Sequence, residues 1–202
     1  MSPLETLGFA LGTSFASGLN LYATVAAAGL FQRLGIVTLP EPLQVLANPV
    51  VLGVAITLFL VEFIADKIPY VDSAWDALHT FIRPPAAALL SYSAFAGEGV
   101  PEEWKLAAAL LAGSVALTSH GAKASTRAAA NASPEPVSNW TLSLLEDGLA
   151  VFLAWMAAEH PLLTAAVVVV LVIVAVFVIW KLYGYLKAAL SKLKRSLSPA
   201  GP

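Results

Sequence analysis

The chain has 202 residues, of which 58% are hydrophobic and 12% are charged, and its formal net charge is -2. Soluble domains are typically about 45–50% apolar and about 25% charged, so a water-soluble globule of this length would have too few charges to cover its surface. This composition excludes an ordinary cytosolic domain and a disordered chain, and the slightly acidic balance excludes a nucleic-acid partner. The lack of cysteine excludes disulfides, zinc–thiolate sites and iron–sulfur clusters. We therefore predict an integral membrane protein that is embedded in the lipid bilayer.

Apolar segments recur along the chain, at residues 4–31, 49–65, 84–95, 104–130, 140–158 and 162–180. The last has 19 residues without a charge, and as a helix it would measure about 28 Å, close to a hydrocarbon core of about 30 Å. A helix is required because a lone strand in lipid would leave its backbone groups unpaired. We predict an all-α polytopic membrane protein with about six transmembrane segments. The segment at 84–97 is short, so whether it spans or re-enters stays open.

Two of these segments, 4–31 and 104–130, are too long for a simple span, at about 40 Å if straight. Each carries small and polar residues near its middle, at 17–20 in the first and at 119–123 in the second. Irregular backbone at membrane depth is tolerated only where protein or water covers it. We therefore predict that both helices are broken or re-entrant at these clusters. Because no Lys or Arg precedes the first segment, we expect it to belong to the mature protein rather than to a signal peptide.

The order of the segments indicates an inverted 3+3 repeat. Each half reads as a long broken helix, a span and a further apolar segment, and shifting the chain by 102 residues places Ser17 on Ser119 and Thr24 on Thr126. Broken helices at matching positions of two inverted halves are typical of secondary transporters. We predict three units, namely a first membrane repeat at 1–97, a second at 98–180 and a basic cytoplasmic tail at 181–202.

Positive charge indicates an orientation. Six crossings would place both termini on one side, and putting them inside gives the cytoplasmic segments seven Lys or Arg residues against two outside. Those inside are Lys67, Arg83, Lys181, Lys187, Lys192, Lys194 and Arg195, and those outside are Arg33 and Lys105. We predict that both termini are cytoplasmic and that the tail lies as a juxtamembrane helix on anionic lipid.

Polar residues of the first broken helix form one candidate site. Ser17, Asn20 and Thr24 are spaced by three or four positions and share a face. Their hydroxyl and amide groups, beside freed backbone carbonyls, could bind an ion or a small polar substrate. The alternative is helix packing, because small residues are what membrane helices use for close approach.

Cations in the second long segment form another candidate. His120, Lys123 and Arg127 lie inside an apolar stretch, where each cation costs about 2.5–3.5 kcal/mol on insertion scales. Such residues normally face a cavity or a partner, so we expect them to bind an anionic group of a substrate. Two alternatives are that Lys123 and Arg127 pair with acidic residues of the next segment, and that 121–136 is a solvent loop.

Residues 72–83 alternate an apolar stripe with a charged one, which predicts an amphipathic helix at the membrane interface. Its charged stripe includes Asp72, Asp76 and His79. Carboxylate and imidazole groups suit several divalent metals, so these three residues are candidate metal ligands, although their spacing is not a specific metal signature. The alternative is a polar face in contact with water.

Four acidic residues in or beside apolar segments are candidates for ion or proton coupling. Glu62 and Asp66 are four positions apart and share a helix face, and Glu146 and Asp147 are adjacent. Carboxylates in such segments normally face the interior of a bundle. There Glu146 and Asp147 would bind a coupling cation or a proton, or serve as counter-ions to the cations described above.

The run at 62–72, continued by Trp75-Asp76, His79 and Arg83-Pro84, is similar to the hallmark of a bacterial membrane-protein family, and so is the Ser-Gly-Leu-Asn run at 17–20. That family is catalogued as domain of unknown function 4126. The resemblance covers most of the chain up to the basic tail. It implies a compact multi-pass protein of the bacterial inner membrane, and it implies no activity and no functional residue.

We therefore expect a secondary transporter or translocase of a small or lipid-linked anionic substrate, without a cofactor unless a divalent cation is used. A chain of 202 residues makes a thin bundle, which favours a homodimer. The alternatives are a membrane-embedded metal-dependent enzyme and a non-catalytic scaffold or accessory subunit. No nucleophile elbow, H-E-x-x-H motif or phosphate-binding loop occurs in the sequence, so transport is favoured over catalysis.

Overall fold

A computed structural model describes residues 1–68, 70–96, 99–131 and 136–197, and these are helical throughout apart from short turns. The elements in chain order are α1 (Pro3–Leu19), α2 (Leu21–Arg33), the 3-10 helix η1 (Glu41–Ala47), α3 (Pro49–Ala65), α4 (Val71–His79), α5 (Arg83–Ala94), α6 (Glu102–Asn131), α7 (Pro136–Glu159) and α8 (Pro161–Leu197). The prediction of an all-α protein is confirmed, because no strand occurs in these described ranges.

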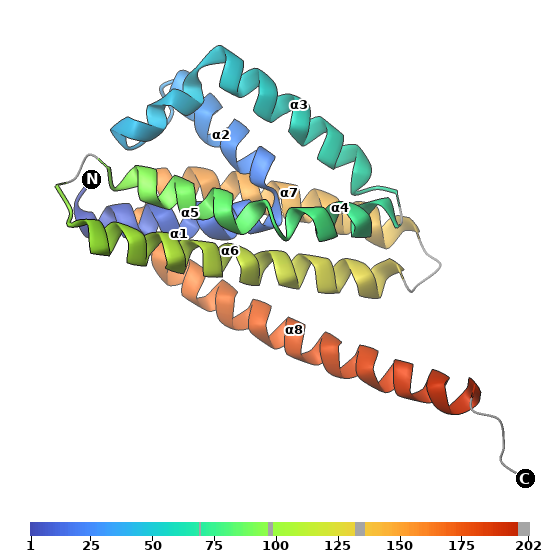
Figure 1. Cartoon of the computed structure of the whole chain (residues 1–202). Helices are drawn as coiled ribbons and strands as arrows, with labels where there is room; N and C mark the ends of the chain where they lie inside the picture. Colours follow the sequence, from blue (N-terminus) through green and yellow to red (C-terminus); the bar gives the residue numbers. More distant parts are fainter. Residues whose placement is uncertain (69, 97–98, 132–135, 198–202) are drawn as a thin grey trace, which may run out of the picture.

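The first long segment is a hairpin of two helices that turns back on itself. α1 starts at a capping box, in which the Ser2 hydroxyl and the Glu5 carboxylate each accept a hydrogen bond from the other residue's backbone N–H. It ends at Asn20, whose extended backbone (φ -150°, ψ 104°) separates it from α2. Phe9 and Ala28 pack in one apolar cluster, so the two helices run antiparallel from the break. The predicted break at 17–20 is therefore confirmed, and the chain folds back on itself there (Figure 1).

The second long segment is different. α6 runs without interruption over 30 residues from Glu102 to Asn131, so the predicted break at 119–123 is wrong, and so is the alternative of a solvent loop for the described part of 121–136. The polar residues there need no freed backbone, because their side chains reach partners on other helices. The two halves of the chain therefore differ at the feature on which the inverted repeat rested.

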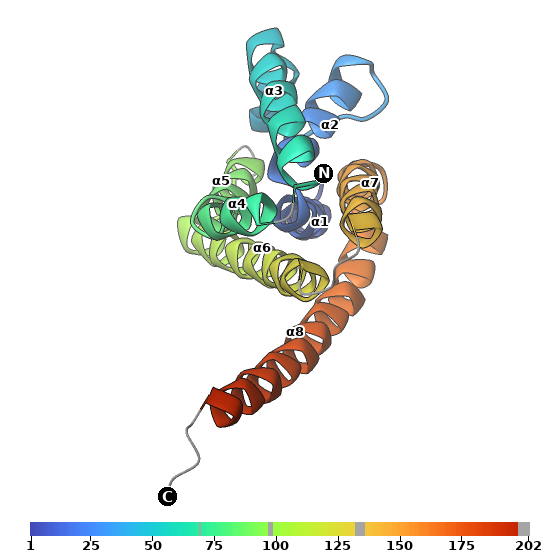
Figure 2. The ribbon, with the colours of Figure 1, turned by 90° about the vertical axis from the view of Figure 1, so that its right-hand side faces the viewer.

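α1 lies near the middle of the bundle. Viewed end-on, α5 and α6 flank it on one side and α7 on the other, while α8 crosses below at an oblique angle (Figure 2). α3 stands away from α1 and is joined to the bundle through α2, η1 and α4, and through ion pairs at its C-terminal end. α1 begins at one end of the bundle and α8 ends at the other (Figure 1).

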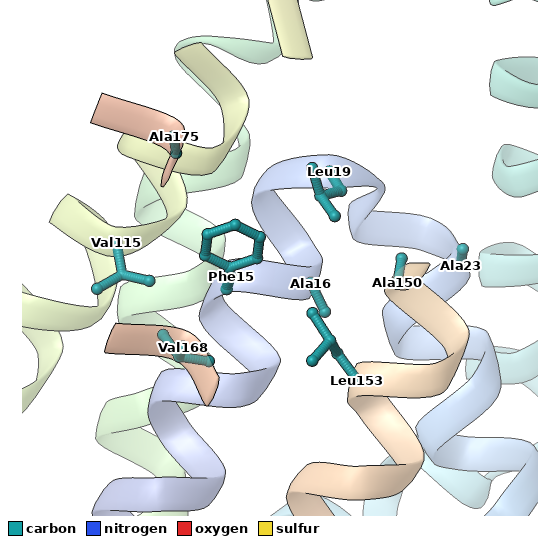
Figure 3. Packing of buried hydrophobic residues seen from close by; sticks show 9 residues of the cluster. All are labelled: Phe15, Ala16, Leu19, Ala23, Val115, Ala150, Leu153, Val168 and Ala175. Carbon is teal, nitrogen blue, oxygen red and sulfur yellow. The ribbon is translucent and has the colours of Figure 1, made fainter. Parts of the chain in front are cut away.

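Small residues allow the close packing around α1. Ala16 of α1 and Ala150 of α7 are fully buried and belong to one cluster with Phe15 of α1 and Val168 of α8 (Figure 3). Gly18 lies directly against α6, where a Cβ atom would collide with Ser119 and with the carbonyl group of Ala116. Membrane helices associate in this way because small side chains let the backbones approach.

Two helical stretches of the described chain are long and apolar enough to cross a membrane, Asn139–Glu159 and Pro161–Tyr185. The pair formed by η1 and α3 would be a third span if it is counted as one, although it bends by 67° at Asn48. These lengths and compositions support association with a membrane. The finer expectation of about six spans remains a prediction.

α4 has its charged face toward the protein. Asp72, Asp76 and His79 are buried, while Leu78 and the following Phe81 are exposed. The alternative of a charged face in contact with water is therefore wrong. The predicted helix at 72–83 also ends earlier, at His79, and a turn leads into α5. The reason for the inverted orientation is that the interior of this protein is polar at that point.

Candidate functional site

The break between α1 and α2 is held by Asn20. Its side-chain oxygen accepts a hydrogen bond from the backbone N–H of Ala23 at 2.8 Å, which caps the first turn of α2. Its side-chain nitrogen donates to Oδ1 of Asp147 on α7, also at 2.8 Å. Thr24 adds a hydroxyl that donates to the backbone oxygen of Asn20 at 2.7 Å. One buried amide thus ends one helix, starts the next and ties both to α7.

The last carbonyl groups of α1 point at two cations. Arg83 Nη1 donates to the Gly18 carbonyl oxygen at 2.8 Å, and Lys123 Nζ donates to the Leu19 carbonyl oxygen at 3.1 Å. A helix C-terminus carries partial negative charge, so cations placed there stabilise it. The hairpin of α1 and α2 therefore turns inside a charged cluster that other helices supply.

Three carboxylates and three cations form a continuous ion network, which we call the charge network. It contains Glu62 and Asp66 of α3, Arg83 of α5, Lys123 and Arg127 of α6, and Glu146 of α7.

The pairs of the charge network run from one residue to the next. Glu62 lies 2.5 Å from Arg83 and 3.4 Å from Lys123, and Asp66 lies 2.8 Å from Lys123. Asp66 also lies 3.2 Å from Arg127.

At its far end, Glu146 lies 2.6 Å from Arg127 and 3.7 Å from Lys123. Five of the six side chains of the charge network are 0% exposed, and that of Glu146 is 11% exposed. Burying a charge costs several kcal/mol, and pairing recovers this cost only when the geometry is good. Apolar residues would be cheaper to bury at these positions, so the charge network is the candidate functional site.

Two further acids border the charge network and make it rich in carboxylates. Asp76 Oδ1 is 3.7 Å from Arg83 Nη2, and Asp147 is bonded to Asn20. Several buried carboxylate oxygens have no hydrogen-bond partner among the described residues, namely Glu62 Oε2, Asp66 Oδ1, both oxygens of Asp76, and Asp147 Oδ2. The site thus holds five acids, the three cations of the charge network and Lys67, which acts on Asp66 and Asp147 through space. It has more carboxylate acceptors than the described donors satisfy.

Burial raises the pKa of Asp76 to about 6, because the desolvated carboxylate is disfavoured more than the nearby Lys123 and Arg83 favour it. Its helix neighbour His79 has a pKa below the ordinary value, again because of burial. Asp76 is therefore a group of the site that changes protonation near neutral pH.

The two histidines are held as neutral tautomers. Because an arginine can only donate, the Nδ1 atom of His120 must accept from Arg83 Nη1 at 2.8 Å, which leaves the proton on Nε2. That Nε2–H is 3.0 Å from the carbonyl oxygen of Asp76. His79 places Nδ1 2.8 Å from the Trp75 carbonyl oxygen and so donates there. Its Nε2 then accepts from the hydroxyl of Tyr22 at 3.1 Å.

The three residues considered as metal ligands do not converge. Asp72 accepts two hydrogen bonds at 2.9 Å from the amide of Asn131 at the end of α6, Asp76 faces Arg83, and His79 is bonded to Tyr22. No group of three or more His, Asp or Glu residues that could hold a metal ion occurs in the described part of the chain.

Most of the residues singled out in the sequence lie together. The contacts described above bring two groups of candidates together at the turn of the α1–α2 hairpin. The substrate-site candidates there are Asn20, Thr24, His120, Lys123 and Arg127, and the coupling candidates are Glu62, Asp66, Glu146 and Asp147. Ser17 is fully buried beside them, and its hydroxyl has no hydrogen-bond partner in the described chain.

The alternative in which Lys123 and Arg127 pair with Glu146 is confirmed, and Asp66 is a second partner for both. Arg83 has a role that the sequence analysis did not assign, although a helix over 72–83 would have placed it on the same face as Asp76.

Comparison with known proteins gives a family and no activity. No curated protein matches the chain, and no solved structure matches it. Residues 7–181 match the family described as Domain of unknown function (DUF4126), a range that includes every residue of the charge network, all of α2 and most of α1. Since this match covers most of the 202 residues, the chain belongs to the DUF4126 family.

Proposed function

We propose that this protein is a secondary transporter or translocase of a small or lipid-linked anionic substrate in the bacterial inner membrane, as a monomer or a homodimer. The observation that carries the proposal is the meeting of a re-entrant helix end with buried, ion-paired Lys123 and Arg127. Helix ends inside a membrane bundle, with charged groups around them, are typical of transporter binding sites.

The charge network supports a mechanism of partner exchange. Lys123 and Arg127 are neutralised by Asp66 and Glu146 in the structure described above. An anionic group that entered would compete for the same guanidinium and ammonium hydrogens. The displaced carboxylates would then be buried without a counter-charge, which is costly. Binding of the anion would thereby favour the entry of a positive charge, such as a proton, together with it.

The excess of acids supports proton coupling. Five carboxyl groups and four cations, with Lys67 included, lie in and around the site, and like charges at close range cannot all stay ionised at low cost. Binding of a proton would reduce the excess negative charge of the site, and Asp76 is a carboxyl group that can exchange one near neutral pH. A site that gains an anion and a proton together keeps its net charge constant during the crossing.

The fold supports a revised orientation. The basic C-terminal part of α8 extends from the end of the bundle opposite to the start of α1 (Figure 1). Because Lys and Arg concentrate on cytoplasmic segments, we place the C-terminal end of α8 in the cytoplasm and the start of α1 on the other side. The charge network, formed by the ends of α1 and α3 and by the second half of α6, then lies nearer to the cytoplasm.

The test uses purified full-length protein in liposomes that contain a pH-sensitive dye. A panel of anions, from inorganic phosphate to organic acids, is added outside, and lipid flipping is followed in parallel with fluorescent phospholipids. Proton-coupled uptake or flipping should exceed that of empty liposomes and should fall at least about tenfold in Lys123→Gln, which removes about 1.4 kcal/mol or more of binding.

The matched control is Lys105→Gln. This lysine lies on the same helix and pairs with Glu102 near the start of α6, where the carboxylate is largely exposed. It should leave rates unchanged within about twofold. Equal rates for wild type, Lys123→Gln and Asn20→Ala would contradict the assignment of this site and would favour a scaffold role.

A further inference from the structure

An apolar groove of about 570 Å3 lies between α2, η1, α3 and α5. Its walls are formed almost entirely by aliphatic side chains. Val54 and Leu89 on its rim are 55% and 67% exposed, so the groove opens sideways, toward the side where lipid surrounds the helices. Apolar pockets of this volume are in the range that holds small ligands.

Three of the helices that wall the groove continue from it toward the charge network. Leu58 lines the groove on α3, and Glu62 follows four positions later on the same helical face. On α5 the lining residue Ala86 is three positions after Arg83. Tyr22 lines the groove on α2, and its hydroxyl is bonded to a histidine beside the charge network. Three separate walls therefore change from apolar to polar at the same end.

Two polar atoms at that end lack partners. Glu62 Oε2 and Arg83 Nε have no hydrogen bond among the described residues, although both residues are fully buried. One is an acceptor and the other a donor, so a polar group beside them would need both kinds of hydrogen bond. A protonated phosphate meets this requirement, because it carries anionic oxygens and an O–H.

The size of the groove argues against a protein partner. A helix with its side chains is about 10–12 Å across and rises about 5.4 Å per turn, so 570 Å3 holds little more than about one turn. A hydrocarbon chain is thinner and fits lengthwise. An apolar groove that ends at charges is complementary to an amphiphile.

We propose that the groove binds the hydrocarbon chain of a lipid whose single chain carries an anionic phosphate head group, with the head group at Glu62 and Arg83. This inference rests on the proposed function and names the substrate class of the same site. The lipid enters sideways between α3 and α5 and presents its phosphate to the charge network.

The experiment measures binding of fluorescent palmitoyl lysophosphatidic acid to the purified full-length protein in detergent. Ala86→Trp and Val54→Trp fill the groove from opposite walls, and the rim position of Val54 keeps the core undisturbed. Each should weaken binding at least about tenfold. Val170→Trp, on an exposed position of α8 away from the groove, should change it by less than about twofold.

Two competitors test separately how much the hydrocarbon chain and the phosphate head group contribute to binding. Palmitoyl monoacylglycerol, which lacks the phosphate, should compete at least about tenfold more weakly than unlabelled lysophosphatidic acid. Inorganic phosphate should not displace the probe. The inference would be overturned by unchanged binding in both groove variants, by equal competition from monoacylglycerol, or by displacement of the probe by phosphate alone. It would also be overturned by a dimer that cross-links through residues 50 and 54 without lipid binding.

Failure of this inference can be distinguished from failure of the proposed function. If the groove variants bind lipid and transport normally while Lys123→Gln abolishes uptake of a small anion, the lipid site is contradicted and the transporter proposal is retained. If lipid binding follows the groove but no substrate moves, the groove holds a bound lipid and the transporter proposal falls.

Discussion

Asn20 and Asp147 are 127 positions apart in the chain, and a 2.8 Å hydrogen bond joins their side chains in the interior. The same asparagine also caps α2 through Ala23. The pair thus links the turning point of the first hairpin to the middle of α7, and it makes the backbone geometry at the break dependent on a helix formed much later in the sequence.

Asn20→Ala should destabilise the protein more than loss of an ordinary helix cap. A cap alone contributes about 0.5–2 kcal/mol, and a buried carboxylate left without its donor adds about 1–3 kcal/mol. Asn48→Ala is the control, because Asn48 caps α3 through Val50 in an exposed position. Thermal unfolding in detergent should show a clearly larger drop in Tm for Asn20→Ala. Equal drops would mean that the bond to Asp147 contributes nothing.

Arg127→Met and Glu146→Gln should each lower the free energy of unfolding, and the loss in the double variant should be smaller than the sum of the two single losses. Removing one member of a buried ion pair costs about 3–5 kcal/mol, because its partner stays buried and uncompensated. The double variant should recover about 1–3 kcal/mol relative to the sum of the single changes. The pair of Lys105 and Glu102 near the start of α6 is the control, with a coupling energy of about 0–1 kcal/mol.

Asp76→Asn should alter the pH dependence of stability. Since the pKa of Asp76 is about 6 in the folded protein and near 4 when unfolded, the folded state holds the extra proton between these values. The contribution of Asp76 to the free energy of unfolding therefore falls as pH rises from about 4 to 6, by roughly 3 kcal/mol.

The asparagine variant lacks this dependence. Its Tm relative to wild type should increase from pH 4.5 to pH 7.5, measured by thermal unfolding at each pH. A constant difference between the two proteins would show that Asp76 does not titrate in this range.

Gly18→Ala should destabilise the contact of α1 with α6. The added Cβ would collide with Ser119 and with the backbone oxygen of Ala116, and backbone cannot move away cheaply. Overpacking of this kind costs about 1–3 kcal/mol. Gly53→Ala is the matched change on α3, where no described atom lies within 4 Å of the new methyl group. It should be neutral or stabilise by up to about 1 kcal/mol, so a Tm shift of the same sign in both variants would contradict the packing argument.

Much of the site could be predicted because lipid penalises lone charges. Lys123, Arg127 and Glu146 stood out in apolar segments, and such groups must find one another. The break at Asn20 was predicted from the polar run around it. The continuity of α6 was missed, although its signal was present: His120, Lys123 and Arg127 are spaced by three and four positions and so share one face of an unbroken helix.

The orientation of α4 could not be read from the sequence. Periodicity separates the face with Asp72 and Asp76 from the face with Leu78, but it does not say which medium each face meets. At an interface the charged face would turn to water, and here the interior is polar and the surroundings are apolar. Deciding between the two requires knowing that Arg83 and Lys123 lie beneath α4, which is a fact of tertiary structure.

The end of the first hairpin has a consequence for how the protein is made. Its exposed carbonyl groups are satisfied by Arg83 and Lys123, which follow Gly18 and Leu19 by 65 and 104 positions. During synthesis the hairpin leaves the ribosome long before these partners exist, and lipid cannot replace them. The hairpin must therefore wait in the translocon or at the membrane surface, and its final burial becomes a late step of biogenesis that follows insertion of α6 and α7.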